Sequence, residues 1–311
     1  MKDFKQALID NDKEALCSIP KVDIHNHGIL CGTRKYAKDH GIEISFEKTT
    51  NIKEFIEFVR NYIGPIQLEE KGLRTFLEGC FDNCLKTGVR DVCPSIDYKS
   101  CMRTFDSDVN RFINFLKSFQ YDNLNIYWDL AISRDSYIEE YKPLIIELLN
   151  TKFFSGIDLA STEKSVPNSA FKEFYELANS LNMVTKVHAG EQLGADYIKE
   201  CIIDFNPKHI QHGITIIEDE SVMKLAKEKG IIFNVCPTSN VVLGHAKSIK
   251  EHPIRKMVDY GLKVTINTDD VLIFESDIND EYLKLYNEGV LSADELDEIR
   301  LFGLSLYKEV K

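Results

Sequence analysis

The sequence has no cluster of lysine and arginine, and 50 acidic residues against 38 basic ones give it a formal net charge of −12. Proteins bind nucleic-acid phosphates through clustered basic side chains, so we expect no nucleic-acid partner. A small substrate that is uncharged or cationic fits this charge better. The N-terminal residues also form no continuous apolar segment, which argues against a signal peptide or a membrane span. We therefore expect a cytoplasmic protein without a membrane partner.

Cysteine pairs of the Cys-x-x-Cys type are absent, although the chain contains eight cysteines. This absence excludes a zinc ribbon and a thioredoxin-type redox site. A chain of 311 residues can bury a large core without disulfides, so we expect reduced thiols. Internal repeats, low-complexity segments and linkers rich in Pro, Gly or Ser are absent as well. We therefore expect a single domain over residues 1–311.

Short apolar segments of β-strand character alternate with longer segments whose apolar residues recur at helical spacing. Residues 2–17 predict one short amphipathic helix. The predicted strands are residues 21–27, 88–96, 124–132, 154–160, 183–188, 209–212, 231–236 and 263–268. Eight strands that alternate with helices favour an α/β fold of the (β/α)8 TIM-barrel type. A doubly wound open sheet is the alternative, but no glycine-rich phosphate loop follows the first strand.

The longest connection between two predicted strands runs from Gly28 to about Thr87 and contains helical patterns of its own. We expect an ordered helical insertion after the first strand. Loops that follow the strands lie at the active face of such a barrel, so residues 28–87 would roof a site there. A purely structural insertion is the alternative.

Ionisable residues stand at the C-terminal ends of four predicted strands, where a barrel places its catalytic groups. Each of them alone has a plain structural explanation, such as a buried histidine with satisfied hydrogen bonds or an aspartate that caps a helix. Their common position at one face favours a functional site instead. They are His25 and His27 after the first strand, His188 and Glu191 after the fifth, His212 after the sixth, and Asp269 and Asp270 after the eighth.

Three histidines and one carboxylate suit zinc better than calcium or magnesium, which take more oxygen ligands. A metal with one open position lowers the pKa of bound water to about 7 and so provides hydroxide for hydrolysis. Glu191 lies three residues after His188, where it can donate or accept a proton. His212 can orient or deprotonate the water.

Six motifs contain or flank these residues. They are His25-x-His27, Gly156-Ile157-Asp158-Leu159-Ala160, Val187-His188-Ala189-Gly190-Glu191, His212-Gly213, Cys236-Pro237-Thr238-Ser239-Asn240 and Asn267-Thr268-Asp269-Asp270. In this order the motifs resemble those of the adenosine deaminase family of metal-dependent amidohydrolases. The resemblance spans about residues 21–274, and the His-Ala-Gly-Glu and Asn-Thr-Asp-Asp blocks are specific in combination.

The resemblance implies that one zinc ion per chain is bound by four residues, His25, His27, His188 and Asp269. Glu191 would protonate a ring nitrogen of the purine, while His212 and Asp269 would position the attacking hydroxide. Asp270 would hydrogen-bond the imidazole part of the purine. The implied reaction is hydrolytic deamination of an adenine-type purine, most directly of adenosine to inosine and ammonia.

Two positions depart from the family pattern, and we predict both as substrate-binding positions. The second histidine of the family is usually followed by Leu, an acidic or amide residue and Gly. Here it is followed by Gly28-Ile29-Leu30, so the usual contact with the ribose 5′-hydroxyl has no counterpart. Ser161 stands where the family usually has a glycine whose backbone meets the purine, which brings a hydroxymethyl group to the pocket floor.

The substrate therefore stays open among adenosine, adenine, an N6-substituted adenine and a 5′-modified adenine nucleoside. A phosphoesterase that begins with His-x-His is an alternative function, but too few further metal ligands stand at the strand ends. A non-catalytic purine-binding protein is another, although Glu191 has no role as a ligand and serves only chemistry.

Ligand type leaves iron and manganese as alternatives to zinc, and no pattern predicts the oligomeric state. The remaining histidines at positions 40, 209, 245 and 252 are predicted to be exposed or structural, with His245 able to line the pocket mouth.

Overall fold

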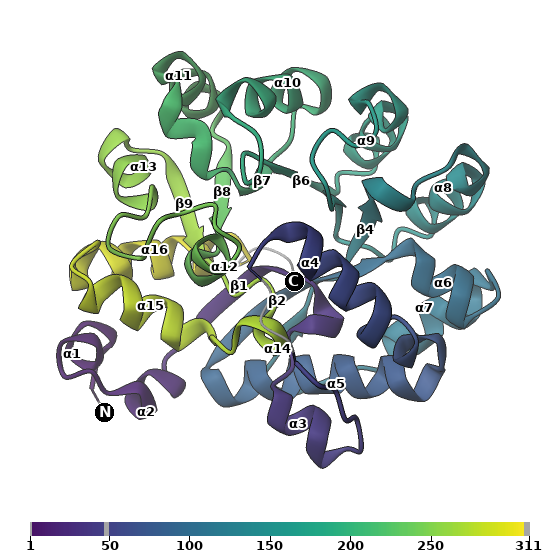
Figure 1. The fold of residues 1–311 in the computed structure, drawn as a ribbon, viewed down its shortest axis with the longest axis horizontal. Coiled ribbons are helices and arrows are strands. Elements are labelled where there is room, and N and C mark those ends of the chain that lie inside the picture. The colour runs from purple at the N-terminus through teal and green to yellow at the C-terminus, as the bar shows by residue number, and fades with distance from the viewer. Residues whose placement is uncertain (1, 47–49, 308–311) are drawn as a thin grey trace.

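The computed structural model describes residues 2–46 and 50–307, which form a barrel of parallel strands inside a ring of helices (Figure 1). The strands pair in the order β1-β2-β4-β5-β6-β7-β8-β9, and every pair is parallel. Their bounds are β1 Lys21–Asn26, β2 Val89–Asp97, β3 Asn125–Ile126, β4 Asp129–Ser133, β5 Gly156–Ala160, β6 Val184–Ala189, β7 His209–His212, β8 Ile232–Val235 and β9 Lys263–Ile266. The predicted (β/α)8 barrel is confirmed.

The third predicted strand, residues 124–132, is two strands in the structure. β3 pairs with the first part of β2 (Val92 opposite Ile126), and β4 pairs with the last part (Ser95 opposite Asp129), in one continuous register. The interruption lies opposite Pro94, which has no backbone N–H to give to a neighbouring strand. The prediction of one strand was wrong at this point because it ignored the partner strand.

The barrel closes between the ends of β1 and β9, close to the predicted metal ligands. The backbone N–H of His27 donates to the carbonyl of Asp269 at 3.3 Å, and the N–H of Asp269 donates to the carbonyl of His25 at 3.1 Å. Below this point the N–H of Ile24 donates to the side-chain oxygen of Asn267 at 2.9 Å. The two ends of the barrel sheet are therefore joined at the C-terminal face.

Helices surround the barrel (Figure 1). Most of these helices come directly after a strand in the chain. The predicted single helix over residues 2–17 is two helices, because Asn11 between them has a positive φ of 53°. The helices are α1 Phe4–Ile9, α2 Lys13–Cys17, α3 Arg34–Asp39, α4 Ile52–Phe58, α5 Glu70–Thr87, α6 Tyr98–Thr104, α7 Val109–Lys117, α8 Lys142–Asn150, α9 Lys172–Ser180, α10 Ala195–Phe205, α11 Glu220–Lys229, α12 Pro237–Val242, α13 Ile254–Tyr260, α14 Val271–Phe274, α15 Ile278–Asn287 and α16 Ala293–Ser305.

The insertion after β1 is helical, as predicted. Its described part contains α3, α4, α5 and three short turns, η1 Gly28–Leu30, η2 Val59–Ile63 and η3 Ile66–Leu68. Its apolar residues form a hydrophobic cluster with α14 that includes Leu30, Phe58, Leu272 and Phe274. Figure 1 shows α4 in front of the centre of the barrel. Hydrophobic packing therefore holds α4 over the face at which the strands end.

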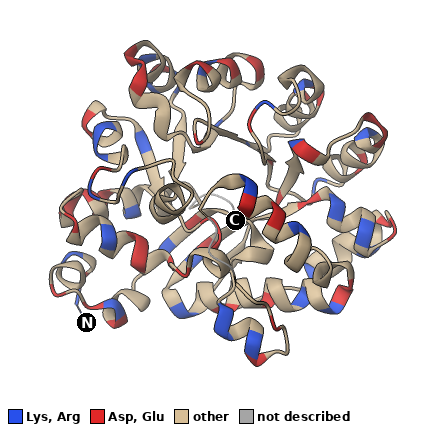
Figure 2. Cartoon of the chain, in the orientation of Figure 1, with Lys and Arg blue, Asp and Glu red and all other residues tan. Residues whose placement is uncertain are grey.

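The main hydrophobic core lies between the strands and the surrounding helices. Helix α7 shows the pattern, because Val109, Phe112, Ile113 and Leu116 are buried on one face. Charged residues are spread over the outer helices (Figure 2). Within the described residues, no helix combines the length and apolar character needed to cross a membrane.

The interior of the barrel is polar beneath its C-terminal face. Lys186 and Asp129 form a fully buried ion pair at 2.6 Å, and Lys186 Nζ also donates to the carbonyl of Ile24 at 2.8 Å. A buried charge needs such partners because it has lost its hydration. The pair therefore joins β4, β6 and β1 directly below the predicted site.

Candidate active site

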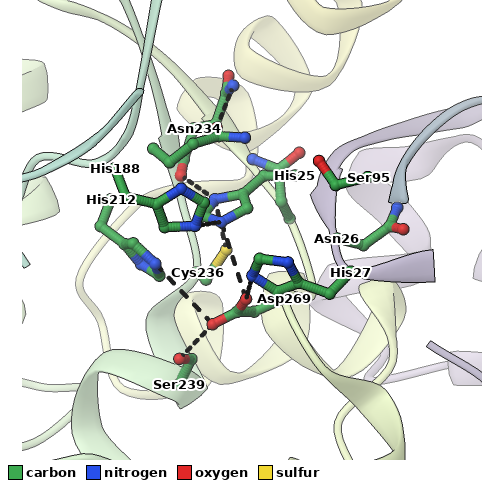
Figure 3. A network of polar contacts seen from close by, with 12 residues as sticks. His25, Asn26, His27, Ser95, His188, His212, Asn234, Cys236, Ser239 and Asp269 are labelled. Atoms are coloured by element: carbon green, nitrogen blue, oxygen red, sulfur yellow. Dashed lines mark hydrogen bonds and ion pairs between the residues drawn. The ribbon is translucent and has the colours of Figure 1, made fainter. Parts of the chain in front are cut away.

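Figure 3 shows the four predicted metal ligands converging from three strand ends onto one point. His25 Nε2 lies 3.2 Å from His188 Nε2 and 3.7 Å from Asp269 Oδ1. His27 Nε2 lies 3.3 Å from the same carboxylate oxygen. His25 and His27 reach this point together because alternate residues of a strand lie on the same side.

The hydrogen bonds behind two of these histidines fix where their protons lie. His25 Nδ1 donates to the carbonyl of Asn234 at 2.8 Å, and His188 Nδ1 donates to the carboxylate of Asp158 at 3.1 Å. An imidazole that binds a metal through Nε2 is neutral and has its one N–H on Nδ1, which is where His25 and His188 make these contacts. Two lone pairs that face each other repel unless a cation lies between them. This arrangement fits a metal site whose ligands are oriented by hydrogen bonds from behind.

Asp269 provides the carboxylate of the donor set. Its Oδ2 atom accepts a hydrogen bond from Ser239 Oγ at 2.6 Å. Its Oδ1 atom is buried and has no hydrogen-bond partner among the described residues. An unpartnered carboxylate oxygen beside three imidazoles fits a metal ligand. Burial disfavours the charged form, but the imidazole of His27, 3.3 Å away, and those of His212 and His25 hold the pKa of Asp269 well below its usual range.

His212 and Glu191 lie beside the donor set. His212 Nε2 is 3.7 Å from Glu191 Oε1 and 3.9 Å from Asp269 Oδ2. His212 also lies close enough to His25 and His188 for the three rings to form a possible metal group. Burial, followed by the negative charges of Asp269 and Glu163, holds the pKa of Glu191 well above its usual range. Its surroundings therefore favour the protonated form of Glu191.

Glu163 holds the backbone around Glu191, and the sequence analysis did not identify it. Its Oε1 atom accepts the N–H of Glu191 at 2.9 Å, and its Oε2 atom accepts the N–H of Leu193 at 2.8 Å. The Glu163 residue is only 5% exposed. Its place two residues after Ser161, in the loop after β5, was the available signal, but the partners of a backbone N–H are not written in a sequence.

The ligands open into a cavity of about 330 Å³ under α4 and η2. Ile52, Phe55 and Val59 of the insertion line it, which supports the prediction that residues 28–87 roof the site. Ile29 also lines the cavity, whereas Gly28 packs elsewhere: a Cβ at this glycine would meet Leu77 and Pro94 at 3.2 and 3.3 Å. The departure from the family pattern after His27 therefore acts on the cavity through Ile29.

Ser161 lies in the wall of the cavity with a positive φ of 78°. Its hydroxyl donates to the carboxylate of Asp135, which also accepts from the backbone N–H and the hydroxyl of Thr162 at 3.2 and 2.8 Å. The side chain predicted to enter the pocket floor is thus held by Asp135. This hydrogen bond compensates a backbone conformation that favours glycine.

Asp270 lines the same cavity, and its Oδ1 atom has no hydrogen-bond partner within the described part of the chain. Burial and the adjacent charge of Asp269 raise the pKa of Asp270 well above its usual value. His245 also faces the site, with Nε2 3.8 Å from Glu191 Oε1. His40 is exposed, and His209 and His252 are buried.

A family model described as "Adenosine deaminase" matches residues 126–305, more than half of the chain. The chain is 29% identical over 316 residues to an adenosine deaminase of Plasmodium gallinaceum, a match that covers 92% of this chain and 86% of that protein. It is 37% identical over 147 residues to an adenine deaminase of Chlorobium phaeobacteroides, with 47% of this chain and 43% of that protein covered.

Among solved structures, the crystal structure of an adenine deaminase from Arthrobacter aurescens superimposes with a TM-score of 0.79. The sequence identity is 22%, and 94% of each chain is covered. The two chains share a fold.

Proposed function

The chain belongs to the adenosine deaminase family, whose members are hydrolases of C–N bonds, and we propose that it deaminates adenosine to inosine and ammonia with the help of zinc. The observation that carries the proposal is the convergence of four potential metal-ligand atoms and a buried glutamate at one cavity. His25, His188 and Asp269 come from three different strand ends, and Glu191 lies beside them.

Zinc is proposed from the chemistry of the donors. Neutral imidazole nitrogens and a single carboxylate oxygen suit a borderline cation, whereas magnesium and calcium take mostly oxygen. The orientation of His25 by the Asn234 carbonyl and of His188 by Asp158 leaves Nε2 of both rings available as ligands. A zinc ion bound here would lower the pKa of a coordinated water and so supply hydroxide at neutral pH.

Glu191 is proposed as the acid of the reaction. Protonation of the purine ring nitrogen next to the amino-bearing carbon makes that carbon electrophilic. The raised pKa of the buried Glu191 carboxyl supports this role, because burial favours the protonated form that an acid needs. Glu163 holds the Glu191 backbone through the hydrogen bond at 2.9 Å and so fixes the direction from which the proton is given.

His212 and Asp270 are proposed as groups that orient the reactants. His212 Nε2 lies between Glu191 and Asp269, where it can contact the attacking oxygen. The free Oδ1 atom of Asp270 among the described residues supports a contact with the imidazole nitrogen of the purine. Burial and the adjacent charge of Asp269 favour the protonated form of Asp270, which would donate a hydrogen bond to that nitrogen.

A second candidate substrate is an adenine nucleoside with an anionic 5′-substituent. The cavity wall contains Arg60 of η2 and both Lys99 and Arg103 of α6, although the molecule as a whole is acidic. Lys99 and Arg103 are four residues apart and so lie on one face of α6. Lys99 Nζ donates to Ser136 Oγ at 2.7 Å and lies 3.6 Å from Asp97. Ile29, at the position that usually binds the 5′-hydroxyl, supports a 5′-modified substrate over adenosine.

The test is an ultraviolet assay of the zinc-loaded protein with adenosine, adenine, N6-methyladenosine, 5′-deoxyadenosine and AMP. Conversion of adenosine with the highest kcat/KM supports the main proposal. A higher kcat/KM for AMP, lost in the Lys99→Met/Arg103→Leu double variant but kept in Lys117→Met on the outer helix α7, supports the second candidate. Failure of zinc-loaded, folded protein to convert any of the five compounds would contradict both.

A further inference from the structure

His212 stands at the end of a buried chain of side-chain hydrogen bonds that reaches away from the metal ligands. Its Nδ1 atom lies 3.0 Å from Asn240 Nδ2. The other side-chain atom of this amide, Asn240 Oδ1, lies 3.3 Å from His252 Nε2. His252 Nδ1 in turn accepts the backbone N–H of Ile254 at 3.1 Å. The exposed fractions of His212, Asn240 and His252 are 1%, 0% and 2%.

The direction of every hydrogen bond in this chain follows from its far end. Ile254 is the first residue of α13, and its backbone N–H is a donor that the helix itself leaves unsatisfied. Because a backbone N–H can only donate, His252 Nδ1 must be the acceptor. Burial lowers the pKa of His252 to about 4, so the ring is neutral and has its single proton on Nε2.

The same reasoning gives the direction of the hydrogen bond between Asn240 and His212. His252 Nε2–H donates to Asn240 Oδ1, which leaves the Asn240 NH2 group as the donor to His212 Nδ1. With Nδ1 occupied as an acceptor, the proton of His212 lies on Nε2.

Backbone hydrogen bonds hold Asn240 in position. The backbone carbonyl of Asn240 accepts the N–H groups of His245 and Ala246, both at 2.8 Å, and its own N–H donates to the carbonyl of Cys236 at 3.1 Å. At the other end, His212 Nε2 is 3.7 Å from Glu191 and 3.9 Å from Asp269, which is beyond hydrogen-bond distance. The Nε2–H group is therefore left for the reactants.

We propose that Asn240 and His252 are positioning residues that fix His212 as the Nε2–H tautomer, so that His212 presents a hydrogen-bond donor to the reacting oxygen and is neither a metal ligand nor a base. The inference rests on the proposed deamination. It assigns a role to the Asn of the Cys-Pro-Thr-Ser-Asn motif and to a histidine that the sequence analysis had predicted to be exposed or structural.

Because His212 keeps its proton in this proposal, the proton of the attacking water must go to another group. As the C–O bond to the purine carbon forms, the attacking water loses a proton to the ionised carboxylate of Asp269, and Glu191 gives its proton to the ring nitrogen. As the C–N bond breaks, Asp269 returns its proton to the departing amine, which leaves as ammonia. Glu191 recovers a proton from the new hydroxyl as that group becomes the carbonyl. His212 keeps its proton throughout.

The first experiment measures the tautomer directly. Zinc-loaded protein with ¹⁵N-labelled histidine is studied by NMR, and the His212 signals are identified by their loss in a His212→Gln variant. We expect Nε2 to carry the proton and Nδ1 to show the shift of an unprotonated nitrogen. A proton on Nδ1, or an Nε2 atom bound to zinc, would overturn the proposal. This readout does not need a substrate, so it remains decisive even if no aminopurine is deaminated.

The second experiment reverses the direction of the hydrogen bond between Asn240 and His212 by replacing the amide nitrogen with an oxygen. In Asn240→Asp the carboxylate can only accept, so we expect the His212 proton to move to Nδ1. We also expect kcat to fall by about 100-fold, the range typical of a lost oriented donor, with zinc content unchanged. Asn179→Asp, an exposed position on α9 with the same change of charge, is the matched control and should keep both kcat and the tautomer.

A pair of variants at His252 separates positioning from packing. Glutamine can accept the Ile254 N–H and donate to Asn240, so His252→Gln should retain most of kcat, whereas His252→Leu should lose as much as Asn240→Asp at similar thermal stability. An Asn240→Asp protein with wild-type rate and tautomer would refute the proposal. So would equal loss of activity in both His252 variants with the His212 tautomer unchanged.

Discussion

The proton of Glu191 is the feature of a single residue on which the proposed chemistry depends most. The carboxyl is buried, it is not one of the four proposed ligands, and Glu163 fixes its backbone. Its raised pKa follows from burial and from the negative charges around it. Removing the proton should therefore affect the rate without affecting metal binding.

We predict that Glu191→Gln binds zinc normally but has a kcat about 100- to 10,000-fold lower, the range of general acid–base catalysis. The amide keeps the size of the side chain but is a very weak acid. Metal content by elemental analysis and kcat with the best substrate check the prediction. Glu176→Gln, an exposed glutamate on α9, is the control and should keep the wild-type rate. Near-wild-type turnover by Glu191→Gln would show that the acid role is assigned to the wrong residue.

Sequence motifs identified the residues whose side chains do chemistry, but not the groups that orient them. His25 and His188 were predicted as ligands because they stand at strand ends. The partner of His25 is the backbone carbonyl of Asn234, and every residue has such a carbonyl, so no letter of the sequence marks it. His252 lies 40 residues from His212, and only the folded chain shows that Asn240 joins them.

Among the elements, α4 lies over the cavity that we propose binds the substrate. Phe55 lines the cavity and stacks on Phe274 of α14, with ring centroids 6.1 Å apart. Burying an aromatic ring against a ligand is worth about 1.5–3 kcal/mol. The helix should therefore contribute to substrate binding more than to the chemical step.

We predict that Phe55→Ala raises KM by about 10-fold, equivalent to about 1.4 kcal/mol of binding energy, while kcat changes little. Steady-state kinetics with the best substrate is the measurement. Tyr62→Ala in η2 is the control, because its half-exposed ring packs on Phe58 and is not part of the cavity wall. A fall in kcat with KM unchanged would place Phe55 in the chemistry instead of the roof.

The start of α16 provides an element whose stability depends on pH. Ser292 and Glu295 form a capping box, and Glu295 also pairs with Arg255 at 2.8 Å. The hydrogen bond with Arg255, ahead of the cap hydrogen bonds, lowers the pKa of Glu295 to about 2. A carboxyl whose pKa is lower in the folded state stabilises the fold above its ordinary pKa near 4.5 and loses this contribution as the pH falls toward 2.

We predict that Glu295→Gln lowers the free energy of unfolding at pH 7 by about 1 kcal/mol, the typical worth of a helix cap or a surface ion pair. The difference from wild type should shrink below about pH 4.5 as wild-type Glu295 becomes protonated. Urea unfolding at a series of pH values checks this. Glu298→Gln, an exposed glutamate on the same helix, should show neither effect. A difference in free energy of unfolding between wild type and Glu295→Gln that grows toward low pH would contradict this prediction.

The elements also show where sequence patterns stop being informative. The strand at residues 209–212 was predicted with its observed bounds. The split of residues 124–132 into β3 and β4 depends on Pro94 in the neighbouring strand. The break of the N-terminal helix depends on the positive φ of Asn11. Both are properties of the folded chain that a local pattern does not contain.

For the whole molecule, the proposed metal site lies where the two ends of the barrel sheet meet. His25 and His27 belong to β1, and Asp269 follows β9, so a bound ion would link the first and last strands where they meet. A ligand that binds only the folded state stabilises it by about 4 kcal/mol at 1,000 times its Kd. Metal binding should therefore be visible as global stability.

We predict that removal of the metal by a chelator lowers the melting temperature by several degrees and that zinc restores it. His188→Gln should melt near the metal-free wild type and should not respond to added zinc. His40→Gln, which changes an exposed histidine, should respond as wild type does. Scanning calorimetry with and without zinc is the measurement, and an equal response of all three proteins would contradict the assigned ligands.

We propose that this barrel is a metal-dependent hydrolase that releases ammonia from an adenine-type purine. The most direct measurement is the amount of ammonia and of deaminated product formed by protein that contains one zinc ion per chain. We expect one ammonia for each purine consumed, loss of the reaction after chelation of the metal, and its return when zinc is added. Zinc-loaded, folded protein that binds adenosine, adenine or AMP and releases no ammonia would contradict it.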